Sequence, residues 1–376
     1  MELDLLGELE RKLETAEKLK ARLSPEEIRE AEKDSHAKRL PRPCGLTIHT
    51  GIGCSLSCLY CYVRDMGFPS ESTPYPLSGL QLAYSLAINP AIALGRGGSL
   101  LAFGAVTEPF MAETAGKTIE YLRVVSRELG NPIQLSTKAY LSSGIAHEIK
   151  NSCDELSALV TIVTLTFHRV LEPLAPSPDQ RYKTMRNLSA AGIHTSLFLR
   201  PILPGLNMRE FEEIMRESME RGASGVVLGS LRVTEGIIER LRAARYPHLS
   251  EIIGRIRGEL GGSKQVTIYS SDLKKQIADR AEKIGLKVYP SACAANIEAH
   301  GLGCAACKMG PCGDEEKIPH FELTDLDKIA VKFGVRIRSS KRDGFKILIK
   351  SEGAARAKRR FADFVKALTK HEILLR

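Results

Sequence analysis

The sequence predicts an α/β protein whose strands lie parallel in one sheet. Apolar, β-rich runs alternate with helical patterns along most of the chain, which is typical of parallel βα units. The 376 residues suffice for one barrel-sized domain with appendages, or for two domains. With 43% hydrophobic residues and no long polar tract, the chain has enough apolar surface to bury a full core.

Six strands are expected in this sheet, at 46–50, 99–104, 132–136, 160–166, 194–200 and 224–229. The helical patterns between them include 113–129 and 208–221. In barrels built from βα units, functional residues gather at the C-terminal ends of the strands. The residues that follow each strand are therefore the first candidates for a site.

The segments before and after the six βα units show other patterns. Residues 2–38 predict two charged helices, the second with Ser24 as N-cap and Pro25 at its first position. Residues 265–289 show a strand–helix–strand pattern that could extend the sheet, and the tail from Thr324 predicts helix, strand, turn, strand, helix. We expect four segments: an N-terminal helical extension (1–43, ending in a linker at 39–43), the βα region (44–235), an α/β extension with a second cysteine group (236–317) and a basic α+β module (318–376).

Cysteine usage and hydropathy predict a cytoplasmic protein. No stretch approaches the ~20 uninterrupted apolar residues of a membrane span, and the N-terminus is charged from its second residue. Seven of the nine cysteines stand in two tight groups. This pattern suits metal sites in a reducing compartment better than a secreted disulfide framework.

The first cysteine group lies in residues 51–62, where Cys54, Cys58 and Cys61 have the spacing CxxxCxxC. Three thiolates on one loop can hold three corners of a [4Fe–4S] cluster and leave the fourth iron open. An open iron can chelate S-adenosylmethionine (SAM) and break its sulfonium bond, chemistry for which a cofactor is needed. Tyr60 precedes the third cysteine, where its ring could cover the adenine. Structural zinc, the main alternative, prefers four protein ligands, and this loop offers three.

The motifs along the βα region resemble a known family. The loop has the CxxxCxφC signature of the radical SAM superfamily, in which φ is aromatic. Together with TEP after the second strand, STK after the third, EPLAPSPDQR (Glu172 to Arg181) and RPILPGLN, it resembles the spore photoproduct lyase-like branch, whose members are often labelled DNA repair photolyase. The resemblance covers about residues 44 to 210. It implies a partial (β/α)6 TIM-like barrel that binds SAM.

The resemblance also implies cofactor contacts. Cys54, Cys58 and Cys61 would bind the cluster, and Tyr60 and Lys138 would contact SAM. Thr107 stands where the lyases have a serine, and Thr107 and Glu108 are candidates to hold the amino group of SAM. Thr164 and Thr166, which alternate onto one face of the fourth strand, are further candidates for cofactor contact. As alternatives, Glu108 could cap the next helix, and Lys138 could be an ordinary solvated side chain.

One departure from the lyases concerns the reaction. Spore photoproduct lyases carry a cysteine in the motif at the second strand, and here the stretch Phe-Gly-Ala-Val-Thr contains none. Cys153 lies on a helical stretch away from the strand end and is expected to be a core or surface thiol. Fold and cofactor therefore transfer to this chain better than the repair of the spore lesion does.

The second cysteine group predicts another metal site. Cys293, Cys304, Cys307 and Cys312 have the spacing Cx10CxxCx4C within a glycine-rich stretch. Four thiolates suit an auxiliary [4Fe–4S] cluster, which we favour, and also suit tetrahedral zinc. Zinc ribbons usually show two matched CxxC pairs, and this group has one. His300 could replace one thiolate, although a lone histidine is usually not a ligand.

The C-terminal tail carries nearly all of the net charge of +9. From Phe321 to Arg376 there are 15 Lys or Arg against 7 Asp or Glu, whereas the preceding residues are close to neutral. Such a basic surface is the electrostatic footprint of a phosphate backbone, although a basic helix is more often a solvated face. The residues expected to contact nucleic acid are Arg336, Arg338, Lys341, Arg342, Lys346, Arg356, Arg359 and Arg360.

These expectations combine into a function. We expect a radical SAM enzyme that cleaves SAM at its [4Fe–4S] cluster to a 5′-deoxyadenosyl radical and abstracts hydrogen from RNA or DNA, which the basic module delivers to the barrel mouth. An electron donor such as ferredoxin or flavodoxin would reduce the cluster, and no membrane is involved. The alternative is a radical SAM maturase that modifies a peptide or protein with an auxiliary cluster. A nucleic-acid-binding scaffold with structural cysteines fits less well, because the first group lacks a fourth ligand.

Overall fold

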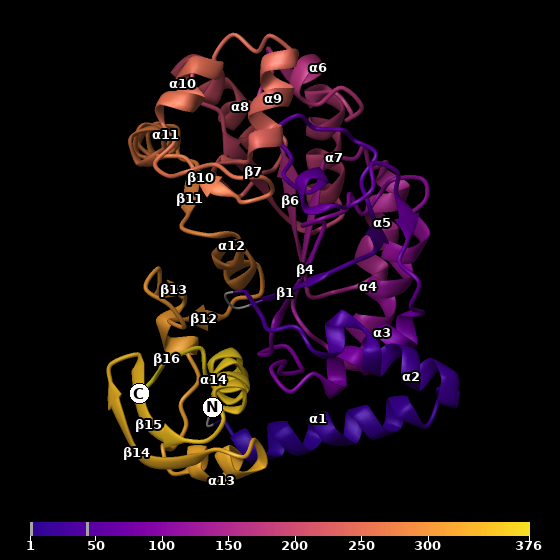
Figure 1. The fold of residues 1–376 in the computed structure, drawn as a ribbon, viewed down its shortest axis with the longest axis vertical. Coiled ribbons are helices and arrows are strands. Elements are labelled where there is room, and N and C mark those ends of the chain that lie inside the picture. Colours follow the sequence, from indigo (N-terminus) through magenta and orange to yellow (C-terminus); the bar gives the residue numbers. More distant parts are fainter. Residues whose placement is uncertain (1–2, 43–44) are drawn as a thin grey trace.

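The computed structural model describes residues 3–42 and 45–376, and its centre is a seven-stranded sheet (Figure 1). All neighbouring strands in it are parallel, in the order β1-β4-β5-β6-β7-β8-β11. Their bounds are β1 Gly45–Ile48, β4 Leu100–Phe103, β5 Ile133–Thr137, β6 Leu156–Thr161, β7 His194–Ile202, β8 Gly225–Ser230 and β11 Lys287–Tyr289. The predicted α/β class and partial TIM-like barrel are confirmed, and β11 extends the six strands by one.

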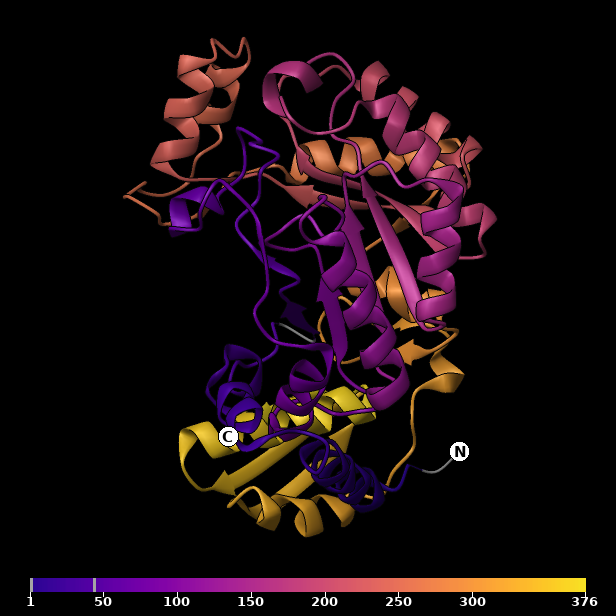
Figure 2. The same cartoon turned by 90° about the vertical axis from the view of Figure 1, so that its right-hand side faces the viewer.

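Most helices between the strands cover the outside of this sheet (Figures 1 and 2). They are α3 Gly79–Ile88, α4 Ala115–Leu129, α5 Ser143–Ser152, α7 Pro178–Ala190, α8 Met208–Glu220 and α11 Ser271–Lys283. The helices α6 His168–Leu171, α9 Glu235–Ala243 and α10 Leu249–Gly254 lie instead beyond the carboxyl ends of the strands (Figure 1). One large core of buried apolar side chains joins these helices to the strands. The carboxyl ends of the parallel strands all open at one end of the barrel, which we call the mouth.

The fourth strand lies earlier than predicted. It spans Leu156–Thr161 rather than 160–166, so Thr164 and Thr166 belong to the loop that follows it. Every residue from 156 to 164 is buried. A run that is buried on both faces has no alternation by which its start could be placed from sequence.

Helix α12, Ala292–Ala299, fills the barrel at the end opposite the mouth. Its Ala294 and Ala295 pack against Leu159 and Val227, on β6 and β8. Asn296 donates hydrogen bonds to the Ile133 carbonyl (2.9 Å) and to the Ser157 hydroxyl (2.8 Å), at the amino ends of β5 and β6. The two-residue strands β12 (Gly303–Cys304) and β13 (Cys312–Gly313) follow α12 as an antiparallel pair.

The C-terminal module lies below the amino ends of the barrel strands in both ribbon views (Figures 1 and 2). It comprises α13 Asp325–Lys332, β14 Arg336–Asp343, β15 Lys346–Glu352, α14 Ala355–Thr369 and β16 Glu372–Leu375. Helix α14 packs on the sheet face that carries Ile347 and Ile349. The sequence prediction omitted β16, which pairs in parallel with β15. A terminal strand of four residues gives too short a pattern to distinguish from a frayed end.

The N-terminal helix joins the barrel to this module. Helix α1 is Leu5–Lys20, and α2 is Pro25–Lys33 with the predicted Ser24 cap. Leu5 and Leu9 belong to the same apolar core as Phe361 and Phe364 of α14. The module therefore completes its core with residues from the other end of the chain.

Parts of the predicted N-terminal organisation lie outside the described residues. These are Met1, Glu2 and the two residues at which the linker 39–43 meets the βα region, 43 and 44. The boundaries of the four predicted segments stay a prediction. Among the residues that the structure places, no helix is long and apolar enough to cross a membrane.

Candidate functional site

The first cysteine loop is anchored at the barrel mouth by its glycines. Strand β2, Gly51–Ile52, follows β1 and pairs antiparallel with β3, Thr73–Pro74. The Gly51 carbonyl accepts a hydrogen bond of 2.9 Å from the Thr107 hydroxyl. Gly53 has a φ of +82°, and a Cβ there would collide with the Glu71 carbonyl. Both glycines are thus required by close backbone approach.

The three thiols of this loop lie close enough to influence one another. Cys58 is buried, and Cys54 and Cys61 are partly buried. The pKa of Cys58 is raised to about 12, chiefly by burial; the Lys138 charge opposes this rise, and the other two thiols contribute to it. A bound metal would supply the positive charge that lets such thiols ionise.

The donor set of the loop fits a [4Fe–4S] cluster with one open iron. Across 3–42 and 45–376, no three His, Cys, Asp or Glu side chains already surround a common metal position. The three thiols of the loop are nonetheless free, and they are near enough to one another for Cys54 and Cys61 to raise the pKa of Cys58. Three soft thiolate ligands are what such a cluster takes from a protein.

Helix α9 binds the cysteine loop through one arginine. The Arg240 guanidinium donates to the Leu59 carbonyl (3.2 Å) and to the Cys61 carbonyl (3.0 Å). It also forms an ion pair of 2.7 Å with Asp65, which accepts a hydrogen bond from Thr234 as well. Sequence analysis missed Arg240 because it lies 179 positions from Cys61.

A buried network holds Tyr60. Its hydroxyl donates to the Glu172 carboxylate, which forms an ion pair of 2.6 Å with Arg181. The side chains of Glu172 and Arg181 are fully buried. Arg181 also donates to the Pro176 carbonyl (2.8 Å) and to the Thr161 carbonyl (3.2 Å). The motif from Glu172 to Arg181, to which the sequence assigned no role, thus fixes the aromatic residue of the cysteine loop.

Glu108 and Lys138 meet at the ends of β4 and β5. The Glu108 carboxylate accepts from the Thr137 hydroxyl (2.5 Å) and from the Lys138 backbone N–H (2.8 Å). Burial raises the pKa of Glu108. The Lys138 ammonium lies 5.8 Å from the centre of the Tyr60 ring, and no carboxylate in the described part of the chain forms an ion pair with it. Glu108 therefore fixes the backbone at the end of β5 by hydrogen bonds. The Lys138 ammonium, which forms no ion pair with a described carboxylate, could bind an anionic ligand.

Thr164 and Thr166 meet at one side chain of α8. The Glu210 carboxylate accepts from the Thr164 hydroxyl (2.6 Å), the Leu165 N–H (2.7 Å) and the Thr166 hydroxyl (3.1 Å). Both hydroxyls meet at one carboxylate, but they do so from the loop after β6 and not from one face of the strand, as was predicted. Their hydroxyl protons are used to tie the loop after β6 to α8, and a role in cofactor binding stays a prediction.

The second cysteine group lines one cavity. Its four thiols come from α12, β12, the intervening loop and β13, and Cys304 lies directly opposite Cys312 in the β12–β13 pair. The cavity is also lined by Gly98, Leu100 and Pro132 of the barrel, and by Lys366 of α14. His300 Nδ1 lies 3.0 Å from the Glu155 carboxylate, and its Nε2 lies 3.1 Å from the Asn296 side-chain amide, so both ring nitrogens are engaged away from the thiols.

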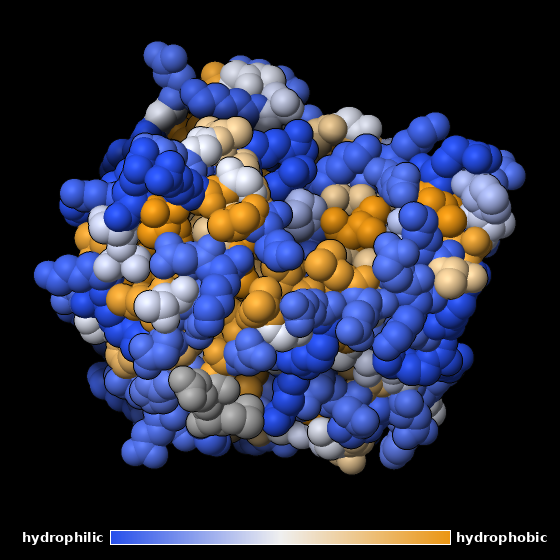
Figure 3. Space-filling view, turned by 90° about the horizontal axis from the view of Figure 1, so that it is seen from below, coloured by the Kyte–Doolittle hydropathy of each residue, from blue (hydrophilic) through white to orange (hydrophobic). Residues whose placement is uncertain are grey.

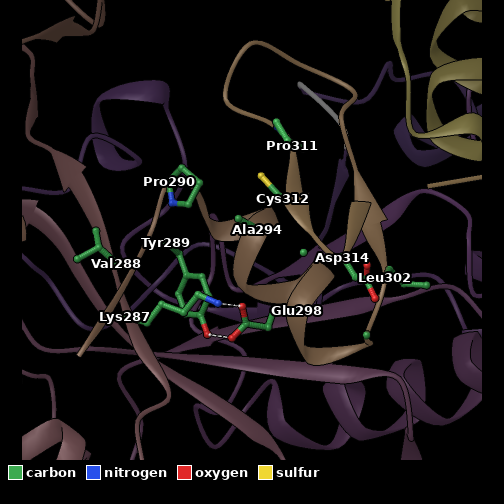
Figure 4. Close-up of a pocket in the computed structure, with 12 residues that line it drawn as sticks. Lys287, Val288, Tyr289, Pro290, Ala294, Glu298, Leu302, Pro311, Cys312 and Asp314 are labelled. Carbon is green, nitrogen blue, oxygen red and sulfur yellow. Dashed lines mark hydrogen bonds and ion pairs between the residues drawn. The ribbon is translucent and has the colours of Figure 1, made fainter. Parts of the chain in front are cut away.

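A surface pocket adjoins this cavity between β11 and the β12–β13 pair (Figure 4). Tyr289 donates a hydrogen bond of 2.8 Å to Glu298, which also forms an ion pair with Lys287. Cys312 lines both the cavity and this pocket. A metal held by the second cysteine group would therefore lie near solvent on one side.

The two cysteine groups lie at different ends of the barrel. The first follows the carboxyl end of β1, whereas the cavity of the second is lined by Gly98, Leu100 and Pro132, at the amino ends of β4 and β5. A strand rises about 3.3 Å per residue, so the four residues of β4 alone correspond to about 13 Å. The two groups are thus separated by about the length of a barrel strand.

The eight basic residues predicted to contact nucleic acid do not form one surface. By the register of β14 and β15, Lys341, Lys346 and the further residue Lys350 share the outer face of the sheet, opposite the buried Ile347 and Ile349. Arg356, Arg359 and Arg360 lie on α14, which packs against the inner face.

Some of these eight residues have protein partners. Arg338 pairs with Glu352 at 2.7 Å, and Arg359 pairs with Asp363 at 3.0 Å. Arg342 donates a hydrogen bond of 2.5 Å to the Phe321 carbonyl. Seen from below, this end of the molecule is largely hydrophilic, with apolar side chains gathered toward the middle (Figure 3). The module thus offers fewer free cations than its composition suggests.

Comparison with known proteins adds to this geometry. Residues 48–217 match the family model described as the radical SAM superfamily. A search of curated proteins finds no significant match. Among solved structures, a spore photoproduct lyase complexed with dinucleoside spore photoproduct superposes with a TM-score of 0.56 at 15% identity, covering 70% of this chain and 83% of the lyase.

Two mutants of a spore photoproduct lyase give similar values. One superposes with a TM-score of 0.56 at 16% identity. The other, with bound AdoMet and dinucleoside spore photoproduct, superposes with a TM-score of 0.55 at 15% identity. Both comparisons cover 70% of this chain and 83% of the lyase chain. At such identities the likeness is one of fold.

Proposed function

We propose a function from the premise that residues 48–217 form a radical SAM domain, so that the chain is an enzyme of the radical SAM superfamily. The domain implies a [4Fe–4S] cluster and SAM as cofactors, and an external reductant. The finer proposal is that the enzyme cleaves SAM reductively and abstracts hydrogen from a nucleic acid. When bound, the cluster and SAM supply the 5′-deoxyadenosyl radical that such chemistry needs.

The side chains at the mouth suit the handling of these cofactors. Cys54, Cys58 and Cys61 would hold the cluster, on a loop that Arg240 fixes. The Lys138 ammonium lies over Tyr60 and near Cys58, where it could form an ion pair with the carboxylate of SAM. Because Glu172 holds the Tyr60 hydroxyl, the ring stays in place and keeps water from that side.

The observation that carries the proposal of a nucleic-acid substrate is the unpaired positive charge of the module. Lys341, Lys346 and Lys350 lie on one exposed face, and no described carboxylate pairs with them. Such a face binds phosphates through counterion release. The shared fold with a lyase complexed with a dinucleoside photoproduct supports the same substrate class.

The position of the module refines this proposal. It lies at the amino end of the barrel, away from the cysteine loop (Figures 1 and 2). It would therefore hold a flanking segment of the nucleic acid, while the reacting nucleotide enters the mouth. The module would therefore anchor the nucleic acid at a distance from the mouth, whereas the sequence had predicted that it delivers the substrate to the mouth itself.

The second cysteine group is proposed to be a separate metal site. Four thiols around one cavity suit a [4Fe–4S] cluster or zinc. Its place at the far end of the barrel speaks against ligation of a substrate there, and so against the peptide-modifying alternative. A ferredoxin or flavodoxin as reductant and a cytoplasmic setting, in which thiols stay reduced, complete the proposal.

Isotope transfer tests the proposed reaction. The reconstituted full chain is incubated anaerobically with SAM, dithionite and oligonucleotides deuterated in sugar and base positions. We expect 5′-deoxyadenosine to form, to carry deuterium from the oligonucleotide, and to be absent with the Cys54/Cys58/Cys61→Ala variant. Formation of 5′-deoxyadenosine without deuterium, at a rate that oligonucleotides do not change, would contradict a nucleic-acid substrate and leave the radical SAM chemistry intact.

A further inference from the structure

One arginine at the mouth forms no ion pair with any carboxylate that the structure describes. Arg200 lies in β7, where the pairing with β8 shifts register between Leu199 and Ile202. Such irregularities re-aim side chains next to active sites. The Arg200 guanidinium lies 5.9 Å from the centre of the Phe198 ring, and no carboxylate in the described ranges bonds to it.

The Arg200 side chain has a defined course. A Cβ at Gly229 of β8 would collide with the Cβ, Cγ and Cδ atoms of Arg200, so the arginine stem lies directly on that glycine. The Arg200 stem therefore lies against β8 near the carboxyl end of β7, at the mouth of the barrel.

Two further cations come from elements that meet at the carboxyl end of β8. The Ser270 hydroxyl, directly before α11, donates a hydrogen bond of 2.9 Å to Ser230 at the end of β8. Lys274, in the first turn of α11, is partly buried, and burial and then the Arg200 charge lower its pKa. Arg232, just after β8, lowers the pKa of Arg200 in turn, although burial is the larger cause. Arg232 makes one hydrogen bond, of 3.4 Å, to the neutral Gln265 side chain.

The acidic side chains of this region are engaged elsewhere. Asp272 pairs with Arg255 at 2.8 Å, and Asp65 pairs with Arg240 at 2.7 Å. Arg200 and Lys274 are partly buried, whereas Arg232 is exposed at the rim of the site. Like charges that are partly removed from water repel one another and are costly without a counter-ion. An anion from outside the chain would remove this cost.

We propose that Arg200, Lys274 and Arg232 form an anion subsite at the barrel mouth, which holds a phosphate of the substrate close to the cysteine loop; this inference rests on the proposed nucleic-acid function. The chemistry recognised is that of an oxyanion, for which guanidinium and ammonium groups are the usual protein ligands. SAM carries an oxyanion too, its carboxylate. Lys138 follows β5 and Arg200 lies on β7, two strands away at about 5 Å per strand, so the two cations serve separate positions.

The subsite also fits the division of labour between the two ends of the molecule. The module lysines would bind phosphates that flank the reacting nucleotide, whereas Arg200 would bind one at the mouth itself. Removing Arg200 should therefore affect short and long substrates alike.

Equilibrium binding of labelled oligonucleotides at several salt concentrations tests the subsite. For Arg200→Gln in the reconstituted full chain we expect weaker binding and a salt slope reduced by about 0.7–0.9, the loss of one phosphate contact. Arg200→Lys should restore part of the affinity. Gly229→Ala, which displaces the arginine and leaves its charge, should weaken binding as well. Arg186→Gln, at an exposed position of α7, is the matched control and should change nothing.

A parallel measurement of SAM binding separates the two sources of the oxyanion. The affinity of Arg200→Gln for SAM should equal that of the wild type. Weakened SAM binding with unchanged oligonucleotide binding would assign the cation to the SAM carboxylate and overturn the proposal.

A third arm, with pyrophosphate at constant ionic strength, separates failure of the subsite from failure of the proposed function. We expect pyrophosphate to raise the melting temperature of the wild type and of Arg186→Gln, and to leave that of Arg200→Gln unchanged. If the wild type binds no oligonucleotide but shows this stabilisation, the subsite stands and the nucleic-acid function fails. If pyrophosphate acts equally on all three proteins, the subsite is contradicted.

Discussion

The two ends of the barrel hold their cysteines in different ways. At the mouth, one short loop carries three thiols, and partners from distant parts of the sequence, including Thr107, Glu172 and Arg240, fix it by hydrogen bonds. At the opposite end, four thiols come from α12, the β12–β13 pair and the loop between its strands, around a cavity closed by α14. The fixed loop at the mouth suits the cofactor site that we propose there, whereas the other end is a joint between barrel and module.

The cations at the two ends of the barrel differ in their burial. Arg200 and Lys138 at the mouth are partly buried, and no carboxylate of the described residues forms an ion pair with either, whereas Lys341 and Lys346 of the module are exposed to solvent. A desolvated charge without a counter-ion is costly and marks a ligand site, whereas solvated charges cost little. Two buried cations therefore say more about function than the larger number of exposed ones.

Breaking the buried network behind Tyr60 should have the largest effect on stability. Arg181→Met leaves the Glu172 carboxylate without its partner in a fully buried site, and we expect a loss of about 3–5 kcal/mol in the free energy of unfolding. Urea denaturation measures it, with the exposed Arg186→Met on the same helix as control. A loss no larger than that of the control would show that this network does not stabilise the mouth.

Removing the arginine that holds the cysteine loop should loosen the cluster. Arg240→Met loses charged hydrogen bonds to the Leu59 and Cys61 carbonyls, each worth about 1.5–3 kcal/mol. We expect faster loss of iron to a chelator and an altered electron paramagnetic resonance spectrum. Arg242→Met, exposed on the same helix, should behave as the wild type. Equal iron retention in both variants would show that the hydrogen bonds of Arg240 do not stabilise the cluster.

Lys138 should matter for SAM and little for stability. If its ammonium pairs with the carboxylate of SAM, Lys138→Met loses a charged interaction of about 1.5–3 kcal/mol, or roughly 10- to 150-fold in affinity. Equilibrium dialysis with labelled SAM measures the change, and the exposed Lys183→Met serves as control. Unchanged affinity would leave Lys138 without the proposed contact.

The module should give the smallest effect, and only with long substrates. Lys341, Lys346 and Lys350, changed together to Gln, should lower the salt slope for a long duplex by up to about 0.9 per lost phosphate contact and leave dinucleotide binding unchanged. Arg338→Gln is the matched control, because Arg338 already pairs with Glu352. Equal slopes for the triple variant and the wild type would reduce this face to a solvated surface.

Truncation of the module is a poorer test than substitution. Leu5 and Leu9 of α1 share the apolar core of α14, and Lys370 donates a hydrogen bond of 3.0 Å to the Gly98 carbonyl of the barrel. Removal of residues beyond 318 would expose that core. The loss of binding would then not report on phosphate contacts.

Much of the fold was predictable because its signals are local. The alternation of apolar runs and helical patterns places five of six strands within a few residues, and Ser24 caps α2 as expected. Strand β6 was misplaced because its neighbourhood is buried throughout and carries no period. Helix α12 gave no signal for its place inside the barrel, since a run of alanines fits many environments.

In the candidate site, too, the residues with a local sequence signal were predictable, and the residues that the fold brings together were not. The spacing of Cys54, Cys58 and Cys61 is a local pattern, and the sequence alone was enough to select them. Arg181, Arg240 and Arg200 act through partners that the fold brings together from strands and helices far apart, so no short motif marks them. Glu210, which takes the hydroxyls of Thr164 and Thr166, belongs to the same class.

Metal analysis tests the central claim most directly. Iron, sulfide and zinc are counted per chain after anaerobic reconstitution of the wild type and of the Cys54/Cys58/Cys61→Ala variant. We predict that the variant loses the iron of one cluster and all reductive cleavage of SAM, and keeps the metal of Cys293, Cys304, Cys307 and Cys312. A wild type that binds no iron, or a variant that still cleaves SAM, would contradict the assignment of the mouth as the radical SAM site.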